Sequence, residues 1–185
     1  RSCVTAMEHG YKAVKIKVGR YELDDDVKRI RLALDTVGKG KRVMVDANQA
    51  WLPEQAQTRI AALAPYRPFW SEEPIGADQP HAAWVALARS SPVPLAAGEN
   101  LRGEQAFSEA LQGGYLGFVQ PDVGKWGGIG GGLSVARQAH ALGVAYCPHW
   151  LAGGVGLAAS MHALAGAGFG DGWAEVDANP NPLRE

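Results

Sequence analysis

Residues 42–48 read RVMVDAN, a short apolar run that ends in an acidic residue. Six further apolar runs along the chain also end in a charged residue. The seven residues lie 29, 26, 27, 23, 27 and 26 positions apart, and they are Lys17, Asp46, Glu72, Glu99, Asp122, His149 and Glu175. A spacing of about 25–30 residues is typical of one strand followed by one crossover helix. The pattern therefore predicts a series of βα units around a parallel sheet.

Seven βα units in series indicate a TIM-type (β/α) barrel, in which the carboxyl ends of the strands form one active site. The chain has 185 residues, fewer than the roughly 250 of a typical barrel. It begins with a helix-like stretch, residues 2–10, so we expect a first strand to precede it. The even spacing leaves no room for a second domain, and we predict one barrel domain, as a fragment, over residues 1–185.

Apolar and polar residues alternate as in a strand at residues 13–18, where Val14, Ile16 and Val18 face away from Lys15 and Lys17. The other strands are expected at 43–45, 69–71, 94–97, 117–119, 144–147 and 173–174. Helices are expected at 23–37, 53–64, 81–89, 104–111 and 155–165. A further helix is expected to follow a glycine-rich turn at 127–132 and to extend to about residue 142.

Composition argues against several classes of partner. The net charge is −1 with 20% charged residues, whereas a nucleic-acid-binding domain calls for a basic face. No apolar run reaches the roughly 18 residues of a membrane span, and no signal peptide is visible. Cys3 and Cys147 form no metal-binding spacing, so a cytoplasmic location is expected.

Three successive expected strands end in the acidic motifs D-A-N, E-E-P and G-E-N. Their carboxylates, Asp46, Glu72 and Glu99, would converge at one edge of the sheet. Three hard oxygen ligands without His or Cys favour Mg²⁺. One such carboxylate would equally serve to cap the following helix, but three in succession favour a metal site.

Lys15 and Lys17 lie two positions apart and would therefore point to the same face of their strand. Two neighbouring ammonium groups repel each other, which favours a neutral amine that can act as a general base. The structural alternative, two surface lysines on an edge strand, fits poorly because a closed barrel has no exposed edge.

Asp122 and His149 would end adjacent strands. A carboxylate beside an imidazole fixes its tautomer and raises its basicity, so the pair indicates acid–base chemistry. Glu175 would end the last expected strand, where it could donate a proton to a developing enolate oxygen or hold His149 in place. The structural alternative for Glu175 is a helix cap or a salt bridge in the tail.

Taken in order, K-x-K, D-A-N, E-E-P, G-E-N, Q-P-D, P-H and the late Glu175 resemble the enolase superfamily. The resemblance is to its mandelate racemase-like group (the mandelate racemase/muconate lactonizing enzyme family) and extends from Lys15 to Glu175. It implies an enolase-like (β/α)7β barrel as the C-terminal domain. It also implies an enzyme in which a Lys or His base acts with Mg²⁺ to stabilise an enediolate.

The resemblance implies a role for each motif. Asp46, Glu72 and Glu99 would bind one Mg²⁺ ion. Lys17 would be the base on one face of the substrate, and His149, paired with Asp122, would be the acid or base on the other face.

The remaining motif residues would support this centre. Lys15 would neutralise the substrate carboxylate and favour the neutral form of Lys17, and Glu175 would hydrogen-bond the enolate oxygen. Glu73 would lie just outside the metal ligands. Asn48 and Asn100 would contact substrate or a water on the metal.

Two features differ from the family pattern. The small N-terminal capping domain and the first barrel strand would lie outside residues 1–185. Muconate cycloisomerase-like relatives place a lysine base where Asp122 stands here, so Lys125 is expected to be structural or secondary. Relatives are commonly symmetric oligomers, which implies a homo-oligomer.

The resemblance implies a small carboxylate substrate, and two reactions stay open: dehydration of an acid sugar, and racemisation or epimerisation of an α-hydroxy acid. We favour dehydration, because a pocket lined by Asn48, Asn100 and Gln120 suits a polyhydroxy acid. Three tryptophans near the same loops would instead suit an aromatic ring, or pack against the fold: Trp51, Trp126 and Trp150.

Two other functions fit part of the pattern. A glycoside hydrolase would use Glu72 and Glu99 as its carboxylate pair, but it would leave both lysines and the Asp122–His149 pair without a task. A non-catalytic metal-binding barrel would leave the whole set of acid–base residues without one.

Overall fold

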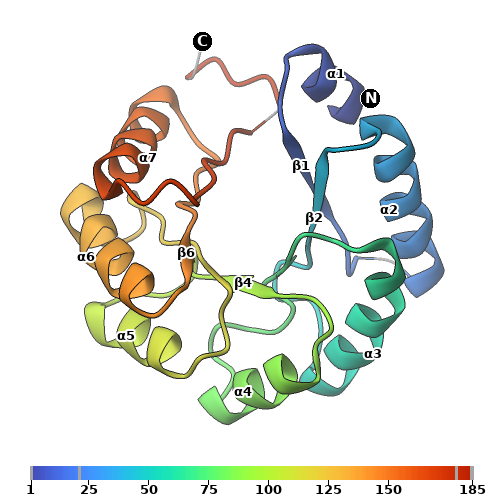
Figure 1. Ribbon diagram of the computed structural model, residues 1–185, viewed down its shortest axis with the longest axis horizontal. Coiled ribbons are helices and arrows are strands. Elements are labelled where there is room, and N and C mark those ends of the chain that lie inside the picture. Colours follow the sequence, from blue (N-terminus) through green and yellow to red (C-terminus); the bar gives the residue numbers. More distant parts are fainter. Residues whose placement is uncertain (1, 21, 178, 184–185) are drawn as a thin grey trace. The chain divides into compact units, whose positions relative to one another are not determined.

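The computed structural model describes residues 2–20, 22–177 and 179–183. Its contacts divide the chain into two compact units, residues 1–95 and 96–185, and each is described by itself. Both units are built from parallel strands that alternate with helices (Figure 1). The strict alternation agrees with the βα units that the sequence predicts.

The first unit contains strands β1 (Ala13–Lys17), β2 (Arg42–Asp46) and β3 (Ser71–Glu72), which pair in parallel in this order. Its helices are α1 (Ser2–Glu8), α2 (Leu23–Val37), α3 (Pro53–Leu63) and α4 (His81–Ser90), with a 3₁₀ helix, η1 (Ala64–Tyr66), directly after α3. Helix α2 packs against β1, β2 and α3, and it lies beside these strands in Figure 1.

One stripe of helix α2 is buried against the strands. Its buried residues are Asp26, Ile30, Ala33 and Val37, spaced by four, three and four positions, which places them on one face. Three of the four are apolar, as the core-facing side of an amphipathic helix requires. Asp26 is the exception, because its carboxylate is fully buried.

Strand register aligns three charged residues in the first unit. Lys17 pairs with Asp46 across β1 and β2, and Asp46 pairs with Glu72 across β2 and β3. Because the strands are parallel, all three residues stand at carboxyl ends. The seemingly separate motifs K-x-K, D-A-N and E-E-P therefore form one row.

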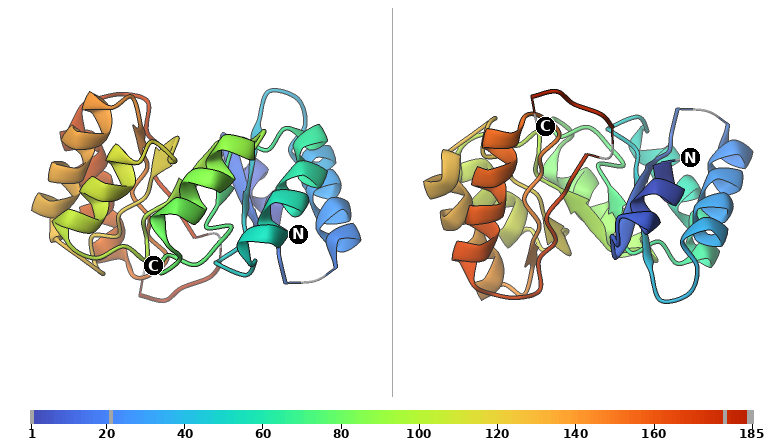
Figure 2. Two further views of the ribbon diagram at one scale, coloured as in Figure 1. Left: turned by 90° about the horizontal axis from the view of Figure 1, so that it is seen from below. Right: turned by 90° about the horizontal axis from the view of Figure 1, so that it is seen from above.

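The second unit continues the pattern with β4 (Leu95–Ala97), of which the last two residues belong to it, β5 (Phe118–Val119) and β6 (Ala145–Tyr146). Ala97 pairs with Val119, and Val119 pairs with Tyr146, all in parallel. The helices are α5 (Glu104–Gln112), α6 (Gly128–Ala141) and α7 (Gly154–Ala167), and α6 packs between α5 and α7 (Figure 2). None of the helices in the described part of the chain has the length and apolar character needed to cross a membrane.

The glycine-rich segment 127–132, expected as a turn, is helical from Gly128 onward. Gly127 and Gly128 take left-handed conformations, with φ angles of 73° and 56°. Gly132 is buried, and a Cβ atom there would lie 2.8 Å from the Tyr146 hydroxyl oxygen. The glycines thus let α6 approach β6 closely, at the cost in helix propensity that glycine carries.

The seventh strand, expected at residues 173–174, does not form. Residues 171–177 have no regular secondary structure. Gly168 and Gly170 before them have left-handed φ angles of 74° and 75°, which end α7 and turn the chain. A Cβ atom at Gly172 would collide with the Tyr146 carbonyl oxygen, so the chain passes close to the β6 backbone there.

Gly98 fixes the close approach of the G-E-N motif to the segment after β5. Its φ is 146°, and a Cβ atom there would lie 2.7 Å from the Gln120 backbone nitrogen. We expect Gly98→Ala to lower the free energy of unfolding by roughly 2–4 kcal/mol, because both the conformation and the backbone contact exclude a side chain. Urea unfolding of the full-length protein would measure this.

The matched control is Gly130→Ala, inside α6, where a Cβ atom meets nothing within 4 Å. This substitution should raise stability by about 0.5–1 kcal/mol, because alanine favours the helix. Equal effects of the two substitutions would contradict the close approach at Gly98.

Candidate active site

The charged residues at the strand ends of the first unit form lysine–carboxylate ion pairs. We call Lys15, Lys17, Asp46 and Glu72 the first-unit cluster. The Lys17 ammonium lies 2.5 Å from Asp46 Oδ2, and the Lys15 ammonium lies 2.5 Å from Glu72 Oε1 and 3.7 Å from Asp46 Oδ2. Both carboxylates are buried, whereas the Lys17 side chain is 47% exposed. The cluster thus places a half-exposed cation beside two buried anions.

The turn after β2 holds Asp46 in place through strained backbone. Asn48 and Gln49 both have left-handed φ angles, 46° and 62°, which are uncommon for residues with side chains. The Asn48 amide donates to Asp46 Oδ1 at 2.9 Å. Strain of this kind clusters at functional sites, so the turn supports the assignment of Asp46 to the site.

The E-E-P motif is joined to this turn. Glu73 is buried and also has a positive φ, 38°, and its carbonyl accepts a hydrogen bond from the Gln49 amide at 2.7 Å. The Ala47 amide donates to the Glu72 carbonyl at 3.0 Å. The D-A-N and E-E-P loops are therefore one hydrogen-bonded structure.

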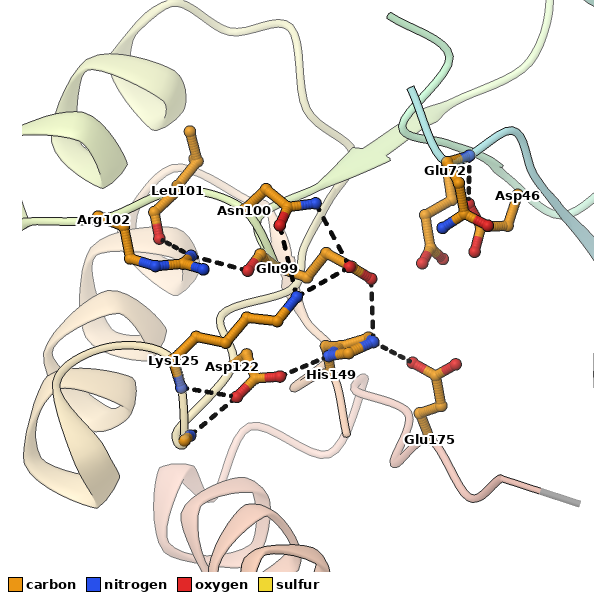
Figure 3. Close-up of polar contacts among 12 residues, drawn as sticks. Asp46, Glu72, Glu99, Asn100, Leu101, Arg102, Asp122, Lys125, His149 and Glu175 are labelled. Atoms are coloured by element: carbon orange, nitrogen blue, oxygen red, sulfur yellow. Dashed lines mark hydrogen bonds and ion pairs between the residues drawn. The ribbon is translucent and has the colours of Figure 1, made fainter. Parts of the chain in front are cut away.

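A second cluster of charges stands at the strand ends of the second unit (Figure 3). We call Glu99, Asn100, Asp122, Lys125, His149 and Glu175 the second-unit cluster. His149 lies at its centre, with Nδ1 2.7 Å from Asp122 Oδ2 and Nε2 2.9 Å from Glu99 Oε2 and 3.9 Å from Glu175 Oε2. The imidazole thus faces three carboxylates.

Asp122 is itself oriented by the backbone. Its Oδ1 accepts the amides of Gly124 at 2.8 Å and Lys125 at 2.9 Å, which turns Oδ2 toward His149. Asp122 and His149 also form a parallel bridge between their segments. Adjacent segments therefore carry the Asp–His pair that the sequence predicts.

Glu99 is held from two further sides. The Lys125 ammonium lies 3.0 Å from Glu99 Oε1 and 3.4 Å from Asn100 Oδ1, and the Asn100 side-chain amide lies 3.3 Å from Glu99 Oε1. Arg102 donates to the Glu99 carbonyl oxygen at 2.8 Å. Lys125, expected to be secondary, is thus the direct cationic partner of a predicted metal ligand.

In the second-unit cluster, charge pairing affects the pKa values more strongly than burial does. Burial alone would lower the pKa of His149, but the hydrogen bond to Asp122 and the adjacent carboxylates of Glu99 and Glu175 raise it to about 9. Burial alone would raise the pKa of Glu99, but His149 and then Lys125 lower it to about 2. The pKa of Asp122 is lowered for the same reason, chiefly by His149 against the effect of burial.

The carboxylates are hard oxygen donors, which is the chemistry that Mg²⁺ requires. Asp46 and Glu72 belong to the first unit and Glu99 to the second. Within the described ranges, no group of three or more His, Cys, Asp or Glu side chains is gathered so that it could hold a metal ion. A centre with all three ligands therefore stays a prediction.

Two contacts of the clusters were not expected from the sequence. Trp70 Nε1 donates to Glu72 Oε2 at 2.9 Å, and both residues are buried. The signal was available, because Trp70 stands two positions before Glu72 and so shares its side of an extended segment. Lys125 gave a weaker signal, since its position in the loop after Asp122 does not fix the direction of its long side chain.

Charged clusters at the carboxyl ends of parallel βα units are typical of a TIM-type α/β barrel domain. Residues 1–183 match the family described as enolase C-terminal domain-like, and the chain belongs to this family. Both the expected fold class and the expected resemblance are confirmed. Members related to this chain are named as dehydratases, cycloisomerases and racemases.

Three relatives define the similarity. Mitochondrial enolase superfamily member 1 from Bos taurus is 36% identical over 157 residues, which cover 84% of this chain and 35% of that protein. The crystal structure of a mandelate racemase/muconate lactonizing enzyme from Bordetella bronchiseptica RB50 is 42% identical with a TM-score of 0.90, covering 99% of this chain and 51% of that one. The crystal structure of L-talarate dehydratase from Polaromonas sp. JS666, complexed with Mg and L-glucarate, is 28% identical with a TM-score of 0.82, covering 94% and 46%.

The raised pKa of His149 predicts a pH dependence of stability in the absence of divalent cations. The protonated imidazole is stabilised only in the folded state, so its contribution is complete below the ordinary pKa of 6.5 and is lost as the pH rises toward 9. We expect a loss on the order of 3 kcal/mol over this range, measured by urea unfolding at a series of pH values.

His149→Gln should abolish this pH-dependent loss, because the variant has no imidazole to deprotonate. The exposed His162 on α7 gives the control His162→Gln, which should keep the wild-type dependence. A wild-type protein whose stability is flat between pH 6.5 and 9 would contradict the charge pairing.

Proposed function

We propose that the protein containing this chain removes the α proton of a small carboxylate and stabilises the resulting enediolate. The observation that carries the proposal is the register-aligned row of Lys17, Asp46 and Glu72 at the ends of three parallel strands. The row places a candidate base next to candidate metal ligands, which is the arrangement that abstraction of a proton beside a carboxylate needs. Membership of the enolase C-terminal domain-like family supports the same class of reaction.

One Mg²⁺ ion bound by Asp46, Glu72 and Glu99 would supply Lewis-acid stabilisation of the negative charge on the substrate. The chemistry of the donors supports this, because all three are hard oxygen ligands and each carboxylate lies beside a cationic side chain: Lys17, Lys15 and Lys125 respectively. The relatives crystallised with magnesium, a racemase and a dehydratase, support this choice of metal.

Lys17 would take the α proton on one face of the substrate, and its exposed side chain gives it the reach to do so. Lys15 would neutralise the substrate carboxylate. His149, oriented by Asp122, would act as acid or base on the other face, and Glu175 would hydrogen-bond the enolate oxygen. Asn48, Asn100 and the buried Glu73 would complete the surroundings of the centre.

We infer that the substrate is an acid sugar and that the reaction is its dehydration, with racemisation or epimerisation of an α-hydroxy acid as the second candidate. The tryptophans that would suit an aromatic substrate are occupied by packing. Trp51 is buried against Gly19, Trp126 packs on Phe107 at 5.1 Å, and Trp150 packs on Gly156. The polar side chains Asn48, Asn100 and Gln120 then match an acid sugar better than an aromatic acid. The relatives named as dehydratases support the same choice.

The charge environment disfavours a glycoside hydrolase. Such an enzyme needs one protonated and one ionised carboxyl group. Cations face both candidate residues instead: Lys15 lies 2.5 Å from Glu72, and His149 and Lys125 lower the pKa of Glu99 against the effect of burial. Hydrolysis of a glycoside in the presence of a chelator would support this alternative. Metal binding without proton exchange on any acid would support a non-catalytic barrel.

The first test follows the α proton of a panel of acid sugars and α-hydroxy acids in D₂O with Mg²⁺, using the full-length protein. We expect deuterium at the α carbon by NMR and loss of water from an acid sugar by mass spectrometry. EDTA should reduce both by at least about 100-fold, and added Mg²⁺ should restore them. Absence of exchange on every acid, or exchange that survives the chelator, would refute the proposal.

Lys17→Ala tests the identity of the base. Removing a general base costs about 10²–10⁴-fold, so α-proton exchange on the Lys17 face should fall by that factor while the fold is retained. The control is Lys28→Ala, which removes an exposed lysine that pairs with Asp25 at 3.1 Å on α2. Normal exchange in Lys17→Ala would assign the base elsewhere.

A further inference from the structure

A fully buried carboxylate supports the turn that follows Lys17. Asp26 stands in the first turn of α2 and is 0% exposed, although its neighbours Asp24 and Asp25 already supply the negative charge that favours a helix start. Burial raises the pKa of Asp26, which reflects the cost of placing a charge there. A helix start alone does not account for this residue.

The contacts of Asp26 lead directly to the end of β1. Its Oδ2 accepts the Gly19 amide at 2.9 Å and lies 3.3 Å from Arg59 Nη1 on α3. The Val18 amide makes the last backbone bond to β2, at 2.9 Å to the Asp46 carbonyl. Asp26 therefore takes over as acceptor one residue beyond the point where the strand pairing stops.

The other side of Gly19 is closed by Trp51. Gly19 has a φ of 83°, and a Cβ atom there would lie 2.7 Å from Trp51 Nε1. The Arg59 guanidinium, which holds Asp26, also lies 5.8 Å from the centroid of the Trp51 ring. Gly19 is thus clamped between a carboxylate and an indole, and Arg59 contacts both.

The contacts around Gly19 matter for Lys17 because Gly19 lies only two residues beyond it. Its side chain is 47% exposed, and its ammonium contacts Asp46 Oδ2. If Asp46 binds the proposed cation, that contact is weakened, and the direction of the lysine then depends on its backbone. The backbone is fixed on one side by the pairing of Lys17 with Asp46 and on the other by Gly19.

We propose that Asp26, held by Arg59, is a positioning residue that fixes the β1–α2 turn and thereby aims Lys17 at the α proton. This inference rests on the proposed function, in which Lys17 serves one face of the substrate and His149 the other. A positioning role toward one base predicts a loss confined to one face. A general structural role predicts equal losses on both.

The test measures α-proton exchange in D₂O with Mg²⁺ for two epimers of one active acid, because epimers present the α hydrogen to opposite faces. Lys17→Ala first identifies which epimer reports Lys17. Asp26→Ala in the full-length protein is then expected to slow exchange of that epimer about 100-fold, the scale of a misplaced catalytic group, with the other epimer changed less than about twofold. Asp26→Asn keeps an oxygen acceptor for the Gly19 amide and should recover at least about tenfold.

Ile30→Val is the matched control, because it weakens the buried face of α2 one turn further on without touching Gly19. It should leave the ratio of the two exchange rates unchanged. If Asp26→Ala does not fold, Arg59→Met replaces it, and a smaller loss on the same face is expected.

Equal losses for both epimers, or no loss for either, would overturn the positioning role and leave the proposed function intact. If the wild-type protein exchanges the α proton of no acid, both the positioning role and the proposed function are overturned. This outcome is distinct because it needs no substitution. Slower exchange confined to the His149 face would overturn the positioning role as well.

Discussion

Burial of negative charge at the strand ends is the constraint on which the rest of the structure depends. Asp46 and Glu72 are almost completely excluded from water, and an isolated buried carboxylate costs several kcal/mol. Strand register offsets this cost, because it brings Lys17 beside Asp46 while Lys15, two residues earlier on the same face, meets Glu72. A slip of one residue would turn both lysines to the other face of β1 and leave the carboxylates without cations. Local strand pairing and the chemistry of the site are therefore one requirement.

The two clusters meet this requirement differently. In the first-unit cluster, Asp46 and Glu72 each have a lysine partner, and both lysine side chains are long and partly exposed. In the second unit, one buried imidazole faces Asp122, Glu99 and Glu175, and Lys125 adds a further cation on Glu99. The lysines of the first arrangement are flexible chains with several rotatable bonds. The second is held by backbone amides on Asp122 and keeps His149 in one orientation.

The sequence predicts the features that depend on residue spacing, but it does not predict those that depend on close contacts between particular residues. Charged residues at even intervals predict the parallel βα units and the strand-end row, because one unit has a nearly constant length. Spacing does not reveal that residues 171–177 form no strand, nor that Gly172 approaches the Tyr146 carbonyl and Gly132 the Tyr146 hydroxyl. Lys125 and Asp26 likewise act through contacts that no residue pattern encodes. The roles of the site residues and the single domain over 1–185 stay predictions.

Support for the site extends outward from the strand ends through charged groups. Lys17 contacts Asp46, Gly19 beyond it contacts Asp26, and Asp26 contacts Arg59 on the next helix. Each contact in this series adds a group from a further element: Asp46 from β2, Asp26 from α2 and Arg59 from α3. Apolar packing would hold these elements together equally well, but it would not fix the rotation of a turn about its strand. Directional hydrogen bonds do so, which gives a physical reason for a fully buried aspartate at a helix start that needs no further negative charge.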